Sequence, residues 1–213
     1  MELDLLAKSL SGGNDFLVAR QGSCPLHIAA ASKSPEATEA VRILLKAMPA
    51  LALQKDGRKR LALHHVLETA GVSMSKMCHH LLLAAPQAVS GPKESMTDCY
   101  ENTPLFLACQ LATRPQPPPG LIEVTKALLL LNPSGASHIA QFNKVPLHVL
   151  APGVTTTSLE VARLVYESYP DGARSKDRIG NYPHKYASTG EMREQLLEWH
   201  RAAVEPVRPS LSI

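Results

Sequence analysis

Leucine and valine recur at helical spacing in four segments of this chain, and each segment stops at a proline. A proline cannot continue a helix, and it disfavours helical geometry in the residue before it. The pattern therefore predicts four amphipathic helices that end at equivalent boundaries. The terminating prolines follow one another at intervals of 37, 47 and 37 residues. The predicted helices cover 41–48, 78–85, 124–132 and 161–169.

A second pattern precedes each of these segments, in the form of a short phrase that opens an apolar run. It reads Cys-Pro-Leu-His-Ile-Ala-Ala from Cys24, Thr-Pro-Leu-Phe-Leu-Ala from Thr103 and Val-Pro-Leu-His-Val-Leu from Val145. Degraded copies begin at Leu61 and Tyr182, so the five phrases begin 37, 42, 42 and 37 residues apart. Two landmarks with nearly the same period predict a repeat array, in which each unit packs only on its neighbours.

The phrases resemble the Thr-Pro-Leu-His-x-Ala signature of the ankyrin-repeat family, over about residues 20–204. The resemblance implies an all-α repeat solenoid, an ankyrin-type stack of helix-turn-helix units with short β-hairpin or turn fingers. It also implies that the histidines of the phrase join neighbouring fingers through backbone hydrogen bonds. The chain departs from the family in its longer units, in the missing proline of the second phrase and in His184, where leucine is expected. Tetratricopeptide-type helical repeats are the alternative fold.

These landmarks predict a single ankyrin-repeat domain over residues 1–205, with a flexible tail over 206–213. About four full repeats lie between two caps, because the ends of a repeat array need a polar outer face. The predicted parts are an N-terminal cap over 1–21, repeats over 22–55, 56–101, 102–142 and 143–176, and a C-terminal capping repeat over 177–205.

Composition narrows the function further. Only 4% of the residues are aromatic, which suits thin stacked helices better than a deep small-molecule pocket, and the net charge of +3 does not favour nucleic acid. The chain begins with acidic residues and no leader-like segment, and its apolar runs are too short to span a membrane. The four cysteines form no paired spacing, which favours reduced thiols. We therefore expect a cytoplasmic protein, with a nuclear location left open.

No motif in the chain predicts catalysis, a cofactor or a metal site, and we expect a protein that is not an enzyme. One alternative is a zinc site in the second unit, although the usual ligand spacing is absent. Its candidate ligands are Cys78, His79 and His80 with His64 and His65. A second feature left open is the proline-rich stretch 114–120, which is either a stiff spacer or a ligand for a proline-binding domain.

Basic residues gather in the predicted fingers, and a basic strip at the edge of a concave surface would attract an acidic partner. Three acidic residues, Asp56, Glu101 and Asp177, interrupt this strip. The basic residues are Lys55, Arg58, Lys59, Arg60, Lys144, Arg174, Lys176 and Arg178.

The leading functional hypothesis is a non-catalytic protein-interaction module or adaptor that presents a concave ankyrin surface to a protein partner. The alternatives are a structural subunit that contacts a larger assembly through its loop insertions, and a metal-binding or enzymatic protein. The resemblance implies partner-contacting residues at the family's variable positions. These are Arg58, Arg60, Asn102, Lys144, Arg178 and Asn181 in the fingers, Ser32, Glu68 and Gln110 on the first helices, and the aromatic residues Tyr100 and Tyr182.

Overall fold

The computed structural model describes residues 22–91 and 96–202, and within them the chain is all-α, as predicted. These residues form ten α-helices, five short 3₁₀-helices and no strand. The predicted β-hairpins are represented there only by turns and by one isolated bridge between Ala140 and Lys144. The predicted N-terminal cap over 1–21 and the tail over 206–213 lie outside the described residues.

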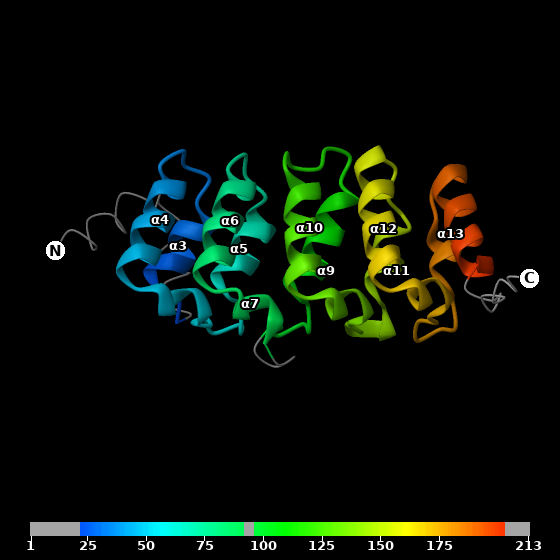
Figure 1. Ribbon diagram of the computed structural model, residues 1–213, viewed down its shortest axis with the longest axis horizontal. Coiled ribbons are helices and arrows are strands. Elements are labelled where there is room, and N and C mark those ends of the chain that lie inside the picture. The colour runs from blue at the N-terminus through cyan, green and yellow to red at the C-terminus, as the bar shows by residue number, and fades with distance from the viewer. Residues whose placement is uncertain (1–21, 92–95, 203–213) are drawn as a thin grey trace, which may run out of the picture.

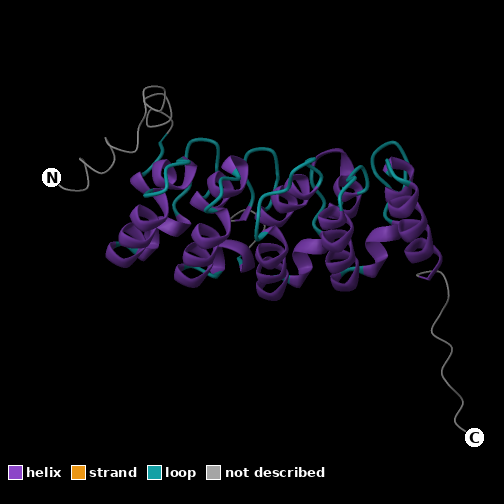
Figure 2. Cartoon of the chain, turned by 90° about the horizontal axis from the view of Figure 1, so that it is seen from above, coloured by secondary structure: helices purple, strands orange, loops and turns teal. Residues whose placement is uncertain are grey.

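The helices follow one another in pairs along the longest axis of the molecule (Figure 1), and from above they form two rows (Figure 2). Within each row, helices contact their counterparts in the next pair: α3 contacts α5, α5 contacts α9 and α9 contacts α11. The first row contains α3 (Pro25–Ala31), α5 (Ala62–Thr69), α9 (Pro104–Ala112), α11 (Pro146–Leu150) and η5 (Pro183–Tyr186). The second row contains α4 (Ala37–Ala47), α6 (Met74–Ala84), α10 (Leu121–Leu131), α12 (Thr156–Ser168) and α13 (Gly190–Ala202).

The backbone returns to the same conformation at equivalent positions of successive pairs. The residue that precedes each first-row helix is extended, with φ from −82° to −90° and ψ from 159° to 167°. The residue before each terminating proline has φ from −144° to −149° and ψ from 75° to 83°. Each proline then opens a short helical turn. These turns are η1 (Pro49–Leu53), α7 (Gln87–Ser90), which begins one residue later, η2 (Pro133–Ser137) and η4 (Pro170–Arg174).

The apolar phrase forms the core between the two rows. Its leucines are buried at successive positions, as Leu26, Leu63 and Leu147, and each is at most 1% exposed. Alanines beside them, such as Ala29 and Ala108, allow the helices to approach closely. The buried side chains form one cluster that runs from the first pair to α13.

Candidate protein-binding surface

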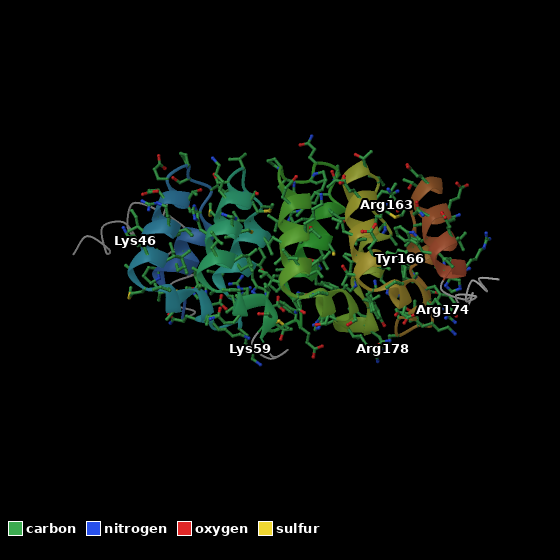
Figure 3. All side chains as sticks on the ribbon, in the orientation of Figure 1. Lys46, Lys59, Arg163, Tyr166, Arg174 and Arg178 are labelled. Carbon is green, nitrogen blue, oxygen red and sulfur yellow. The ribbon has the colours of Figure 1, made fainter. Side chains whose placement is uncertain are left out.

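Four five-residue loops carry the surface that the sequence predicted as fingers. We call them the fingers and number them after the repeat unit that each one opens: the second finger covers 56–60, the third 98–102, the fourth 140–144 and the fifth 177–181. In each finger the N–H of the first residue donates to the carbonyl of the fifth, at 2.9, 3.1, 3.0 and 3.0 Å in chain order. The closing hydrogen bond brings the ends of each loop together, so the residues between them form an outward turn. Two of these turns contain Lys59 and Arg178, which lie at the lower edge of the molecule in Figure 3.

The first residue of three fingers is an aspartate whose side chain turns inward. Asp56 Oδ1 accepts the N–H groups of Arg58 and Arg60, at 2.8 and 2.9 Å. Asp98 repeats this arrangement with the third and fifth residues of its own finger, at 2.8 Å each. Asp177 does the same at 3.0 and 2.9 Å. All three aspartates are buried, so their charge serves the turn and not the outer surface.

This result corrects the sequence-based view of the strip. Asp56 and Asp177 do not interrupt the exposed charge, because both carboxylates face their own backbone. Asp98 was missed, although the sequence contains a signal for it. Asp56, Asp98 and Asp177 each stand five residues before the first residue of a phrase, and Ala140 stands at the same distance in the fourth finger. Glu101 is exposed and remains an acidic residue at the finger surface.

Histidines of the phrase join the fingers to the helices, as the resemblance implied. His27 Nδ1 accepts the N–H of Cys24 at 3.0 Å, and its Nε2 lies 3.1 Å from the carbonyl of Arg60. His64 and His148 repeat this pattern towards the carbonyls of Asn102 and Asn181, at 3.2 and 3.1 Å. Because Nδ1 accepts a hydrogen bond, Nε2 must carry the proton of the neutral ring and donate to the carbonyl. The predicted structural role of these histidines is confirmed.

Burial keeps these imidazoles neutral. Burial lowers the pKa of His64 to about 4, and it lowers the pKa of His27 and His148 below the ordinary value of 6.5. Protonation of Nδ1 would place one donor against another in a buried site, which is costly. The three histidines therefore hold the fingers most firmly near neutral pH.

Further hydrogen bonds run directly from finger to finger. The N–H of Cys99 donates to the carbonyl of Arg58 at 2.9 Å. The N–H of Arg178 donates to the carbonyl of Phe142 at 2.8 Å. Between these two pairs, His138 Nε2 lies 2.8 Å from the carbonyl of Glu101. The fingers thus form a continuous row that is fixed before any partner arrives.

The third residue of each finger lies at its tip. These tip residues are Arg58, Tyr100, Phe142 and Ile179, and all four are exposed. Lys59 and Arg178 are exposed beside them. The sequence predicted Arg58, Tyr100 and Arg178 as contact residues and missed Phe142 and Ile179. All four tip residues stand three residues before a phrase begins, and this constant spacing would have identified Phe142 and Ile179.

Several other predicted contact residues are engaged inside the protein. Arg60 forms ion pairs with Asp56 Oδ2 at 2.7 Å and with Glu68 Oε2 at 2.8 Å, so it belongs to a local network with His65. Lys144 Nζ lies 4.7 Å from the centre of the Tyr186 ring. Arg60 and Lys144 are both half-buried. The exposed cations within the fingers are therefore Arg58, Lys59 and Arg178.

The remaining predicted contacts divide into half-buried and exposed residues. Asn102 and Asn181 are half-buried and donate their side-chain amides to Asp98 and Tyr186. Tyr182 is half-buried and stacks on His184, with Lys176 over its ring. On the first helices and their ends, Glu68 and Gln110 are exposed, and Ser32 is half-buried.

The residues of the proposed zinc alternative do not converge. Cys78 is buried, and burial raises the pKa of its thiol to about 12, whereas His79 is exposed on the second row. His65 is turned away, towards Asp56. Among residues 22–91 and 96–202, no group of three or more His, Cys, Asp or Glu side chains is arranged to hold a metal ion.

A second surface lies on the opposite row of helices. A groove of about 330 Å³ separates α6 from α10, and its lining is mostly apolar. Two leucines on its rim, Leu83 and Leu130, are highly exposed, and both stand two residues before the end cap of their helix. The equivalent residues of α4 and α12 are Lys46 and Glu167. Apolar exposure at this position is therefore confined to the two middle helices among these four.

No family model and no curated protein matches this chain. The fold, however, is similar to a chain of a solved structure from Bdellovibrio bacteriovorus, described as the predatory endopeptidase Bd0816 in complex with the immunity protein Bd3460. The identity is 15% and the TM-score is 0.64, with 91% of this chain and 96% of that chain covered. This likeness supports the fold of the described pairs.

The likeness also bears on the prediction that the chain is not an enzyme. That prediction is contradicted, because the description of the similar structure names an endopeptidase. At 15% identity the likeness establishes the fold alone, and it assigns neither an activity nor a catalytic residue to this chain. We therefore withdraw the exclusion of enzymatic activity. Within the described part of the chain, no helix has the length and apolar character needed to cross a membrane.

Proposed function

We propose that the chain is an ankyrin-type stack that serves as a protein-interaction module and contacts an acidic protein surface along its fingers. The recurrence of the same backbone angles in successive pairs supports the stack. The histidine bridges that join α3, α5 and α11 to the next finger support the ankyrin-type arrangement. A rigid row of fingers favours binding, because little conformational entropy is lost when a partner docks.

The observation that carries this proposal is the inward orientation of the finger aspartates. Their carboxylates accept backbone N–H groups of their own turns, whereas Arg58, Lys59 and Arg178 remain exposed. The outward charge of the fingers is therefore more basic than the sequence suggests. Such a surface accelerates the encounter with an acidic partner and suppresses binding to basic ones.

The similar structure provides secondary support, since its description names two proteins in complex. The alternative of an assembly subunit is favoured by one observation, the apolar groove between α6 and α10 with its two exposed leucines. The two hypotheses place the partner on opposite rows of helices, so surface variants separate them.

The test is a cross-linked affinity capture from native extract with mass spectrometry. The charge variant combines Arg58→Glu, Lys59→Glu and Arg178→Glu, and it leaves Arg60 intact because that residue stabilises the second finger. The control combines Leu83→Ser and Leu130→Ser on the groove. A partner retained by wild type and by the control, but lost by the charge variant, supports the proposal. A partner lost only by the groove variant would overturn it in favour of the assembly subunit.

A further inference from the structure

We infer that Tyr100, Phe142 and Ile179 form an apolar ridge that anchors the partner, and that the partner offers an apolar pocket bordered by carboxylates. This inference rests on the proposed protein-binding function and specifies the chemistry of the partner. The three residues, which we call the tip ridge, occupy the third position of three successive fingers.

Their exposure is the first argument. The fractions of surface exposed to solvent are 52% for Tyr100, 63% for Phe142 and 76% for Ile179. Single exposed apolar residues are common on protein surfaces, but here three recur at one register position along a fixed row. Aromatic residues held in such positions are the usual anchors of protein interfaces.

The backbone of the fourth finger is the second argument. Phe142 has φ 61° and ψ 22°, and the next residue, Asn143, also has a positive φ of 58°. A bulky side chain in this left-handed region is sterically disfavoured, and glycine or asparagine would avoid the cost. The turn nevertheless places phenylalanine there, which indicates that the ring is retained for a contact and not for the fold.

The hydrogen bonds around this tip keep its backbone in place. The Phe142 carbonyl accepts the N–H of Arg178, and Asn143 Nδ2 donates to the carbonyl of Lys176 at 2.7 Å. Both bonds reach the fifth finger and its approach, so the fourth tip cannot fold back without breaking them. An anchor residue whose backbone is already fixed loses less entropy on binding.

The charges at the two ends of the tip ridge indicate which groups should surround the partner's pocket. Arg58 and Lys59 lie in the finger before Tyr100, and Arg178 lies beside Ile179, whereas Glu101 is the exposed acidic residue within the row. A protein surface with carboxylates around an apolar depression would satisfy both the cations and the ridge. A nucleic-acid backbone would meet the cations but would leave the apolar side chains in water.

A selection from a displayed library of random linear peptides tests the inference. The enriched peptides should combine Asp or Glu with Leu, Phe or Trp. Phe142→Ser should weaken their binding at least about tenfold, as expected for an aromatic anchor. Ile179→Ser should weaken binding less, and Leu130→Ser on the opposite row should leave it unchanged. Fluorescence anisotropy at low and high salt measures each affinity, and circular dichroism confirms that each variant folds.

Failure of the tip ridge can be distinguished from failure of the proposed function. Purely acidic peptides that bind Phe142→Ser as tightly as wild type, yet are lost by the Arg58, Lys59 and Arg178→Glu variant, would overturn the tip ridge and leave the proposed function standing. Peptides that bind all finger variants equally would overturn both. The absence of any enriched peptide would also count against both.

Discussion

The second and fourth fingers close with the same backbone hydrogen bond, but they differ in their side chains and turn angles. In the second, a buried carboxylate on Asp56 accepts two backbone N–H groups and pairs with Arg60 and His65. In the fourth, Ala140 offers no carboxylate, and two consecutive residues take left-handed backbone angles. The difference shows that a finger can close without an inward carboxylate. A finger can therefore either stabilise its own turn or expose an apolar tip.

The largest effect should come from the core beneath the fourth finger. Leu147 is 1% exposed and lies in the first turn of α11, so Leu147→Ala removes buried volume and should cost about 2–4 kcal/mol of unfolding free energy. Denaturant titration followed by circular dichroism measures the loss. A cost below about 1 kcal/mol would mean that the fourth unit is packed loosely, and that its finger is not fixed from below.

The histidine bridges predict that the free energy of unfolding depends on pH. His64 has a pKa of about 4 in the folded chain and about 6.5 when unfolded, so the unfolded state binds a proton first as pH falls. The contribution of His64 to the free energy of unfolding should be fully present above about pH 6.5. It should decline between pH 6.5 and 4, by up to about 3 kcal/mol. Denaturant titrations across this range measure it. In His64→Gln the stability at neutral pH should fall, and the slope of unfolding free energy against pH should flatten. An unchanged slope would contradict the proposed role of the His64 hydrogen bonds.

Asp56 should act in a lower pH window. Burial acts to raise the pKa of Asp56, but the hydrogen bonds from Arg60 and from the finger N–H groups outweigh it and lower the pKa below 3.8. Its contribution is therefore present above about pH 4 and is lost only in stronger acid. Asp98→Ala removes two such hydrogen bonds and should cost about 1–2 kcal/mol at neutral pH. The reciprocal change, Ala140→Asp, should be neutral or stabilising; a large loss would show that the two kinds of finger are not interchangeable.

A smaller effect of opposite sign is expected at the fourth tip. Phe142→Asn places a residue that tolerates left-handed angles where phenylalanine is strained, and it should stabilise the fold by about 0.5–1 kcal/mol. Thermal unfolding measures the gain, and peptide binding should weaken at the same time. A variant that is less stable than wild type would show that the ring packs on the protein.

The smallest effect is predicted at the second tip. Arg58 is exposed, so Arg58→Ala should change the unfolding free energy by less than about 0.5 kcal/mol. Arg60→Ala should cost more in the same titration, because Arg60 pairs with a buried carboxylate. Equal losses from the two changes would remove the distinction between outward and inward cations on which the binding proposal depends.

The sequence by itself determined the features that depend on local chemistry. Prolines set the ends of the second-row helices, because a missing N–H and a fixed φ act within one turn. The spacing of leucines set the buried faces, and the all-α class was implied by the family resemblance of the repeated phrases. The constant position of Asp56, Asp98 and Asp177 before the phrase was also present in the sequence. Only the structure showed that their carboxylates accept the N–H groups of their own fingers.

Only the tertiary structure decided which charges and which apolar side chains face a partner. Arg58 and Arg60 are two residues apart and look equivalent in sequence, yet one is exposed and the other forms ion pairs with Asp56 and Glu68. Phe142 was not among the predicted contact residues, yet it lies exposed at a tip. In both cases the outcome depends on a turn angle and on hydrogen bonds to residues more than 30 positions away, such as that from His27 to Arg60. Residue type and spacing do not contain that information, because it arises only when neighbouring units pack together.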